Sequence, residues 1–303
     1  MSNVLKRLWG NPWLLLALCI TFWASNVVVS RLAPGHVSPL VLSSARWGIA
    51  CLILLPFFWR ELLRERDVIR QNWLYLVLMS SAGYTVYTWL FYGAGTYTSG
   101  VNIAMLVSLA PVFAFAISWA CLGMNAGPVA LLALALTLAG ALTVASRGDL
   151  AALKALNFNA GDLMMIGASF LHGAYTVFLR NRPPLSSISF FLVLIIVAMV
   201  SSIPTLVAEY ATGKIFFPTP AGWLLIVYVG VFPTILSMFF YMRGVELIGP
   251  HRTSLFYNLT PVLGAFFAVA FLGEPFATYH AAGFALVICG IVMAERWRAR
   301  QSS

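Results

Sequence analysis

Long apolar segments decide what this chain can fold into. Ten of them follow one another, each close to the length of about 20 residues that a helix needs to cross a bilayer. They occupy residues 13–31, 38–59, 73–95, 98–122, 128–146, 161–181, 186–207, 221–243, 252–273 and 277–295. Hydrophobic residues make up 61% of the 303 positions and charged residues only 9%, whereas a soluble domain is about a quarter charged. The sequence therefore predicts an all-α integral membrane protein with ten transmembrane helices.

An internal duplication relates the two halves of the chain. At an offset of 150 positions the matched pairs include Leu109 and Leu259, Pro111 and Pro261, and Gly123 and Gly273. The linker 147–160 divides the ten segments into two sets of five, and because five is odd the second set must cross the membrane in the opposite sense. We therefore expect two inverted five-helix repeats, residues 1–147 and 148–303. Transporters use this construction, with the substrate site between the halves.

Basic residues set the predicted orientation. With a cytoplasmic N-terminus, thirteen Lys and Arg residues fall at cytoplasmic ends, four at outer ends, and Arg46 within a segment, which accounts for all 18. This bias follows the positive-inside rule. Both termini are therefore expected on the cytoplasmic side of a bacterial-type inner membrane. The net charge of +9 is spread over short loops, which argues against a nucleic-acid surface.

Catalytic and metal chemistry have no clear signature in the sequence. The four cysteines lie in apolar segments without CxxC spacing, and the four histidines form no HExxH pair. We expect no metal, no cofactor and no enzyme activity. An intramembrane protease is disfavoured because Asn159-Ala160-Gly161-Asp162 lacks the first glycine of a GxGD motif. A passive scaffold or receptor is disfavoured too, because it would not need inverted halves.

Two stretches, Gly83 to Ala145 and Val231 to Ala294, share one pattern. Each has a polar-aromatic helix, a short turn, a helix with a central proline that ends in Leu-Gly, and an Ala/Gly-rich helix. In these features the chain resembles the ten-helix drug/metabolite transporter superfamily, in the branch with paired EamA domains, over nearly its whole length. Glu274 matches the acid that follows Leu-Gly in the family, whereas Met124 replaces it in the first half. Within the superfamily the chain looks most like the YddG-type aromatic amino acid exporters.

Polar and aromatic side chains within the segments are the candidate substrate contacts, because polar groups in hydrocarbon are costly and should face the bundle interior. Helical spacing groups them on common faces. The candidate substrate-binding residues are Trp23, Asn26, Tyr84, Tyr87, Thr88, Asn102, His172, Tyr175, Ser237, Tyr257 and Asn258. Their helices are repeat mates, and the resemblance implies that these helices line a central cavity. For any single hydroxyl or amide, packing or interhelical bonding is the alternative.

Two ionisable side chains lie within segments. His172 is near the middle of the sixth segment. It either titrates in the working range or is a neutral histidine satisfied by a neighbour. Arg46, in the second segment, matches an Arg often found there in the family. It either bonds helix-end carbonyls, the preferred interpretation, or binds a substrate carboxylate. Since no acid lies at mid-membrane, either His172 carries proton coupling or the protein works as a facilitator.

Three prolines are candidate hinges: Pro111, Pro233 and Pro261. Each lacks an amide proton and frees the carbonyl four residues earlier, which for Pro233 is that of Val229. Kinks at matched places in both halves are candidate bending points, with static kinks as the alternative. The freed carbonyls could also accept a substrate ammonium group.

The inverted halves predict a transporter, and the resemblance implies a secondary transporter that exports amino acids, chiefly aromatic and other bulky apolar ones, through a central cavity by alternating access. A pocket of aromatic rings, amides and hydroxyls suits an apolar side chain with a zwitterionic head. It also suits drugs or nucleosides, so an exporter of drugs, nucleosides or other metabolites is the alternative. The expected partners are the small-molecule substrate and the lipid bilayer, with no nucleic acid and no obligate protein partner evident.

Overall fold

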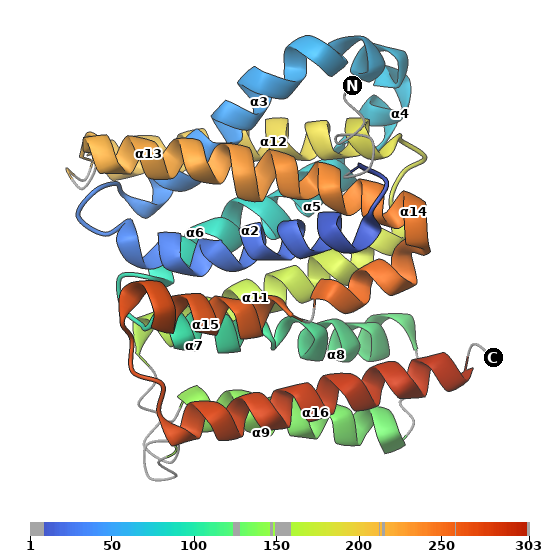
Figure 1. Cartoon of the computed structure of the whole chain (residues 1–303). Coiled ribbons are helices and arrows are strands. Elements are labelled where there is room, and N and C mark those ends of the chain that lie inside the picture. Colours follow the sequence, from blue (N-terminus) through green and yellow to red (C-terminus); the bar gives the residue numbers. More distant parts are fainter. Residues whose placement is uncertain are drawn as a thin grey trace.

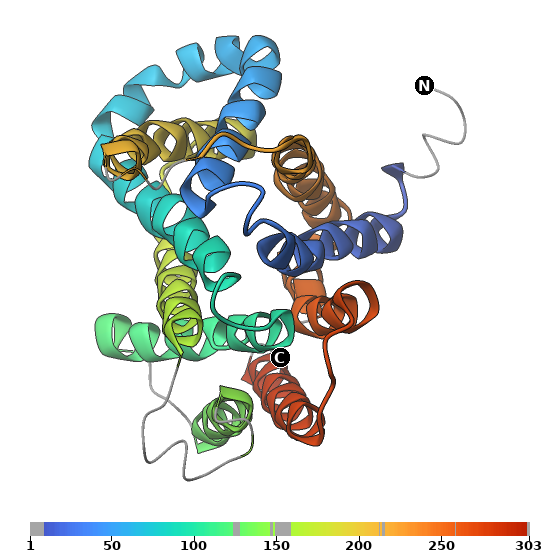
Figure 2. The ribbon, with the colours of Figure 1, turned by 90° about the vertical axis from the view of Figure 1, so that its left-hand side faces the viewer.

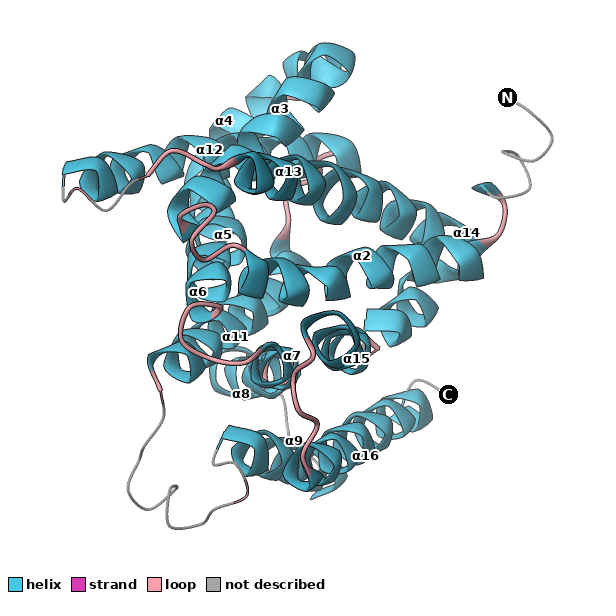
Figure 3. Cartoon of the chain, turned by 60° about the vertical axis from the view of Figure 1, so that its left-hand side comes forward, coloured by secondary structure: helices cyan, strands magenta, loops and turns pink. Residues whose placement is uncertain are grey.

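The computed structural model describes residues 9–123, 128–145, 148, 159–211, 213, 216–257 and 259–301. Throughout these ranges every regular element is a helix (Figures 1 and 3). The elements are α2 Pro12–Leu32, α3 Pro39–Arg64, α4 Arg66–Gln71, α5 Trp73–Ser80, η1 Ser81–Val86, α6 Tyr87–Ala94, α7 Gly100–Val107, α8 Ala110–Leu122, α9 Pro128–Ala145, α11 Ala160–Phe178, η2 Leu179–Asn181, α12 Ser187–Ala211, α13 Pro220–Val229, η3 Gly230–Leu236, α14 Ser237–Tyr257, α15 Thr260–Leu272 and α16 Thr278–Gln301. Helices suit a bilayer because they satisfy backbone polar groups internally.

Among the residues that the structure describes, seven helical stretches are long and apolar enough to cross a membrane. They are Pro12–Leu32, Pro39–Arg64, Trp73–Ala94, Gly100–Cys121, Ala160–Asn181, Ser187–Ala211 and Pro220–Ile248. Three shorter apolar helices, Leu131–Gly140, Thr260–Leu272 and Thr278–Gly290, fall where the fifth, ninth and tenth segments were expected. The chain is therefore a multi-pass membrane protein with seven candidate crossings in its described part, and the expected count of ten is not confirmed by length and composition.

Polar caps begin several of the helices. The capping residues include Asn11, Ser38, Ser99, Asn159 and Thr219. At the start of α2, Asn11 Oδ1 accepts hydrogen bonds from the amides of Trp13 and Leu14, at 3.1 and 3.2 Å. The first amides of a helix lack partners within the helix, so a capping oxygen satisfies groups that lipid could not.

Irregular turns recur at matched places in the two halves. The π-helical turn η1 follows α5, and the π-helical turn η3 follows α13. In each half the chain is then interrupted just before a proline, between α7 and α8 and between α14 and α15. Helix α15 begins 150 positions after α8, which is the offset of the sequence duplication. The duplication therefore extends to local backbone geometry.

Pro111 and Pro261 start new helices rather than kinking long ones. Each is the second residue of its helix, α8 or α15. A proline in the first turn leaves no hydrogen bond unmade, because that amide has no partner within the helix. Both helices end at a glycine in the left-handed conformation, Gly123 at φ 61° and Gly273 at φ 65°. The expected mid-helix kink is therefore an interruption of the helix just before each proline, and in the first half the stretch Gly100–Cys121 is still long and apolar enough to cross as one span.

Helix α14 differs from the sequence expectation at its centre. The eighth segment was expected to end at 243 and the ninth to begin at 252, but α14 runs through both positions. Arg243 Nη1 and Glu246 Oε2 pair at 2.7 Å across one helical turn, which supports the helix there. Gly244 packs directly on α2, since a Cβ at this position would lie 2.9 Å from Cγ of Leu16.

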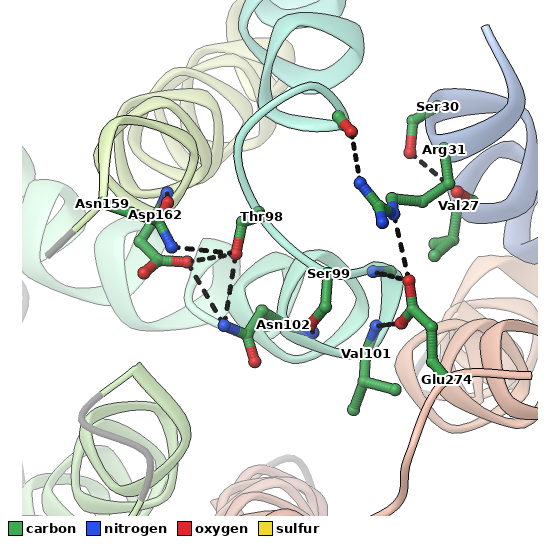
Figure 4. A network of polar contacts seen from close by, with 12 residues as sticks. Val27, Ser30, Arg31, Thr98, Ser99, Val101, Asn102, Asn159, Asp162 and Glu274 are labelled. Carbon is green, nitrogen blue, oxygen red and sulfur yellow. Dashed lines mark hydrogen bonds and ion pairs between the residues drawn. The ribbon is translucent and has the colours of Figure 1, made fainter. Parts of the chain in front are cut away.

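The first helices of the two halves run in opposite directions across the bundle (Figure 1). The C-terminal end of α2 lies at the same end of the molecule as the N-terminal end of α11, as the contacts in Figure 4 show. The start of α2 and the end of α16 lie together at the opposite end (Figure 1). The chain therefore enters and leaves the bundle on one side.

Helices α9 and α16 pack against each other below the remaining helices in Figure 2. Glycines allow the close approach. A Cβ at Gly140 would lie 2.8 Å from Val287 Cγ2, and one at Gly290 would lie 2.6 Å from the carbonyl oxygen of Ala133. Small residues at helix contacts let backbones approach in lipid, so the Ala/Gly-rich fifth and tenth segments form a packing pair.

Candidate functional site

A buried arginine joins the two halves of the molecule. Arg46 on α3 is only 7% exposed. Its Nε and Nη2 donate to Thr234 Oγ1 of η3, at 3.0 and 2.7 Å, and its Nη1 donates to the hydroxyl of Tyr92 on α6, at 2.7 Å. Tyr92 in turn donates to Asn26 Oδ1 on α2, at 3.0 Å. The guanidinium is therefore held by neutral side chains rather than by the helix-end carbonyls expected from the sequence.

The π-helical turn η3 positions Thr234. A π-helical turn disturbs the regular backbone ladder, and side chains bond its carbonyls here. Thr234 Oγ1 donates to the carbonyl of Val229 at 2.7 Å, and Ser237 donates to the carbonyl five residues before it at 2.9 Å. Trp23 Nε1 of α2 donates to the carbonyl of Pro233 at 3.2 Å. The Val229 carbonyl that Pro233 was expected to free for a substrate thus already has a protein donor.

Seven aromatic rings form a closed series with the guanidinium of Arg46. In order they are Trp47, Tyr84, Tyr175, His172, Tyr87, Phe91 and Tyr92, and we call them the aromatic circuit. Neighbouring ring centroids are 5.2 to 6.1 Å apart, distances typical of aromatic pairs. Arg46 Cζ closes the series, 4.5 Å from the ring centroid of Trp47 and 5.8 Å from that of Tyr92. The rings come from α3, η1, α6 and α11, so both halves contribute.

Four members of the aromatic circuit keep accessible surface although protein surrounds them: Tyr84, Tyr87, His172 and Tyr175. The other three are almost completely buried. These four rings therefore offer surface that the rest of the protein leaves uncovered. The absence of a side chain at Gly83 allows this arrangement, since a Cβ there would lie 2.7 Å from Cγ of Tyr175.

The aromatic circuit thus unites four of the predicted site residues, and Trp23 and Asn26 lie beside it. Trp23 packs on Tyr241 with ring centroids 5.4 Å apart, besides its bond to η3. Trp47 was not among the predicted site residues. Its position next to Arg46 in the sequence could have identified it. Tyr92 was not among the predicted site residues either.

Three other predicted residues have structural partners or lie elsewhere. Thr88 is buried and its hydroxyl donates to the carbonyl of Tyr84 at 2.6 Å. Ser237, fully buried, bonds the π-helical backbone described above. Asn102 lies at the start of α7, away from the aromatic circuit, where its Nδ2 is 3.2 Å from Thr98 Oγ1. These contacts fit the packing alternative for the three residues. The side chain of Tyr257, and Asn258 as a whole, lie outside the described residues.

A second polar network ties helix ends together at the end of the bundle where α2 finishes (Figure 4). The carboxylate of Glu274, which is 10% exposed, accepts hydrogen bonds from Arg31 Nε at 3.0 Å and from the amides of Gly100 and Val101 at 2.9 and 3.0 Å. Arg31 Nη1 also donates to the carbonyl of Gly95 at 2.8 Å. A carboxylate at the start of α7 is favourable because the first helical amides point at it. We call this set the Arg31–Glu274 network.

Asp162 forms a parallel network at the same end (Figure 4). Thr98 donates to Asp162 Oδ1 at 2.7 Å, and the amide of Asp162 donates to Asn159 Oδ1 at 2.8 Å. Asn159 therefore caps α11, and the Asp162 carboxylate tethers the start of this helix to Thr98, which is a structural task rather than the catalytic one of a protease motif. In the described part of the chain, no three His, Cys, Asp or Glu residues are grouped as metal ligands.

Comparison with known proteins gives a consistent result along the whole chain. The model of the EamA-like transporter family matches residues 10–146 and 159–295. The Bacillus subtilis protein named "Uncharacterized transporter YyaM" is 25% identical over 294 residues, which cover 94% of this chain and 93% of that protein. A protein of Archaeoglobus fulgidus, named an uncharacterized transporter, is 24% identical over 288 residues, or 92% and 96% of the two chains.

The fold also matches a solved structure. One crystal structure superposes with a TM-score of 0.65 and 19% sequence identity, covering 96% of this chain and 98% of its own. At that identity the likeness concerns the fold alone. The names of the related proteins state transport without a substrate, so the finer likeness to aromatic amino acid exporters stays a prediction.

Proposed function

Because this chain belongs to the EamA-like transporter family, we propose that it is a secondary transporter that exports amino acids, chiefly aromatic and other bulky apolar ones, by alternating access. The chain is a membrane transporter by family, and the proposal concerns its substrate and direction. The observation that carries it is the aromatic circuit, a series of seven rings from both halves that the guanidinium of Arg46 closes.

Aromatic rings favour a flat apolar substrate. Rings in offset or edge-to-face pairs contribute about 0.5 to 1.5 kcal/mol each beyond area burial, and Tyr84, Tyr87, His172 and Tyr175 keep accessible faces. Polar groups of Asn26 and Arg46 lie next to these rings. A side chain with an aromatic ring and a polar head matches this pairing.

The proposed topology has ten crossings in two inverted five-helix repeats, residues 1–147 and 148–303. The seven candidate crossings and the three shorter apolar helices in the described part of the chain together support that count. The opposite directions of α2 and α11 support inversion (Figure 1). The thirteen-to-four distribution of basic residues supports the proposal that both termini are cytoplasmic, in a bacterial-type inner membrane.

Alternating access requires one end of the site to close while the other opens. In this conformation the Arg31–Glu274 network joins α2, α7 and the end of α15 at the end assigned to the outer side. We propose that this network closes the outer end and separates during export. The helix breaks before Pro111 and Pro261, together with the π-helical turn at Pro233, are the proposed bending points.

Counterflow tests the proposal. Purified full-length protein is reconstituted into liposomes loaded with unlabelled phenylalanine, and uptake of labelled phenylalanine is followed without an ion gradient. We expect protein-dependent accumulation that tryptophan competes away and that the lipophilic cation tetraphenylphosphonium leaves unchanged. Liposomes without protein provide the background. Exchange also establishes that no imposed proton gradient is needed.

Two results would contradict this function. Competition by tetraphenylphosphonium but not by tryptophan would favour the alternative, an exporter of drugs or other metabolites. Failure of counterflow both without a gradient and with a pH gradient imposed, in protein that is folded and inserted, would remove amino acids as substrates.

A further inference from the structure

We infer that Arg46 is the substrate anchor and that it binds a carboxylate group carried by an aromatic molecule. The inference rests on the proposed function, and it narrows the substrate class to organic acids with a ring. The first observation behind it is that Arg46 has no oppositely charged partner among the described residues. The ion pairs in the described part of the chain join Arg31 to Glu274, Arg66 to Asp67 and Arg243 to Glu246.

Arg46 therefore carries a buried positive charge that no described carboxylate neutralises. Charged side chains within a bilayer are expensive and commonly pair with an opposite charge. The partners of Arg46 are hydroxyl groups and aromatic faces, which stabilise a cation only in part. An anionic ligand would supply the missing charge.

The hydrogen-bond inventory leaves room for such a ligand. A guanidinium has five N–H groups. Three of them donate to Thr234 and Tyr92, which leaves one N–H on each terminal nitrogen without a described acceptor. Two neighbouring N–H groups match the two oxygens of a carboxylate, which is the geometry that distinguishes Arg from Lys as an anion anchor.

A second orphan donor lies in the same place. The indole N–H of Trp47, a side chain only 3% exposed, has no hydrogen-bond partner among the described residues. The ring of Trp47 lies beneath the Arg46 guanidinium. Buried donors are normally satisfied in native structures, so this part of the site lacks acceptors. A ligand with a carboxylate would supply both the missing negative charge and the missing hydrogen-bond acceptors.

The aromatic circuit indicates what else the ligand carries. From Arg46 the series of rings passes through Trp47 and Tyr84 on one side and through Tyr92 and Phe91 on the other. A carboxylate at Arg46 thus lies within a few ångströms of ring faces on both sides. One cation suits a monoanion better than a phosphate, which would bring about two negative charges at neutral pH.

Binding of four matched probes to the purified full-length protein tests the inference. The probes are L-phenylalanine, L-phenylalaninamide, 3-phenylpropanoate and 2-phenylethylamine, all radiolabelled and measured at equilibrium. They share one ring, and only the first and third carry a carboxylate. We expect wild-type protein to bind these two at least about tenfold more tightly than the other two, as loss of a charged hydrogen-bonded pair entails.

Variants locate the preference. Arg46→Gln should weaken phenylalanine binding by about 10- to 100-fold and remove the distinction between acid and amide. Arg46→Lys keeps the positive charge but lacks the two parallel N–H groups of a guanidinium. Its affinity for phenylalanine should lie between those of the wild type and Arg46→Gln. Arg64→Gln is the matched control, because it removes the same charge from an exposed position on the same helix, and it should bind like wild type. The wild-type probe series needs no variant, so it decides the matter even if Arg46→Gln fails to fold.

The outcomes separate this inference from the proposed function. Equal binding of acid and amide by wild type would overturn the carboxylate anchor and leave amino acid transport standing. Binding of 3-phenylpropanoate without phenylalanine would support the anchor and overturn the amino acid proposal. Binding of none of the probes would overturn both. A carboxylate preference that survives in a folded Arg46→Gln protein would place the anchor at another residue.

Discussion

Arg46 illustrates how a membrane protein can hold a cation among neutral groups. Thr234 and Tyr92 fix the orientation of the guanidinium, and the face of Trp47 covers it. Each of these contacts is weaker than an ion pair, so the charge stays available to a ligand. His172 also has aromatic neighbours. Its ring lies between those of Tyr87 and Tyr175, with centroids 5.3 and 6.1 Å away.

Replacing His172 tests whether its ring borders the substrate. His172→Ala should reduce phenylalanine counterflow by about tenfold, because a stacking surface worth about 1 kcal/mol or more is lost. His172→Phe keeps a ring and should retain most of the activity. Thr176→Ala, an exposed position one turn later on α11, is the control. Equal loss in the Ala and Phe variants would mean that the imidazole itself, rather than a ring, is required.

Glu274 offers a test of the proposed outer closure. Glu274→Gln removes the charge that Arg31 and two amides of α7 share. We expect the free energy of unfolding to fall by about 1 to 3 kcal/mol, since charged hydrogen bonds are lost at a largely buried site. Thermal unfolding in detergent measures it.

Glu246→Gln supplies the comparison, because the Arg243–Glu246 pair is 62% exposed at the carboxylate. An exposed pair contributes little, so this change should stay within about 0.5 kcal/mol. Equal effects of the two substitutions would show that the Arg31–Glu274 network does not hold the outer end together.

Sequence reasoning at the residue scale found the aromatic side chains but not their partners. Helical spacing identified Tyr84, Tyr87 and the His172 face, because periodicity within one helix is visible in the chain. The hydroxyl of Thr234 as the acceptor for Arg46 was not foreseeable, since the two residues are 188 positions apart. Only the packing of η3 on α3 brings them together.

At the scale of elements, irregular turns are the feature that the two halves share most clearly. The π-helical turns η1 and η3 both border the candidate site, one through Tyr84 and the other through Thr234. Such turns expose backbone groups that a regular helix would pair, and they occur frequently at functional sites. The sequence marked η3 by Pro233, whereas η1 contains no proline and gave no comparable signal.

The pairing of α9 with α16 can be tested through its glycines. Gly140→Ala should lower the free energy of unfolding by about 1 to 3 kcal/mol, because the added methyl group would overlap Val287 and the facing backbone. Gly48→Ala, where a Cβ meets nothing within 4 Å, should instead be neutral or stabilising by up to about 1 kcal/mol. Thermal unfolding distinguishes the two, and a stable Gly140→Ala protein would contradict the close packing.

Breaks between helices were harder to predict than the helices themselves. Proline at Pro111 and Pro261 predicted a disturbance, but a proline fits both a kinked helix and the first turn of a new one. The continuous α14 shows the reverse case, where a charged stretch resembled a loop and formed a helix. Local residue types do not decide such cases, because neighbouring helices stabilise one outcome.

For the whole molecule, the apolar segments were predictable because the bilayer dictates both helix length and hydrophobicity. The duplication was predictable because matched residues such as Pro111 and Pro261 recur at a fixed offset. The family match over residues 10–146 and 159–295 bears out the resemblance at the level of the EamA family. The contact between Arg31 and Glu274 at the end assigned to the outer side was not predictable, since the two residues are 243 positions apart in the sequence.

Cysteine accessibility tests the proposed orientation. In a cysteine-free background, Tyr97→Cys lies at the end assigned to the outer side, and Arg64→Cys lies at the opposite end, both at exposed positions. A membrane-impermeant maleimide applied to intact cells should label Tyr97→Cys alone, and Arg64→Cys only after permeabilisation. The reversed pattern would place the termini outside and turn the Arg31–Glu274 network into an inner closure.

The most direct test of the site is a crystal structure with 4-bromo-L-phenylalanine, in which anomalous scattering locates the bromine. The account predicts one strong bromine peak among the rings of Tyr84, Tyr87, His172 and Tyr175, with the ligand carboxylate on Arg46. A peak between α9 and α16, or at the lipid-facing surface, with an empty aromatic circuit would contradict the account.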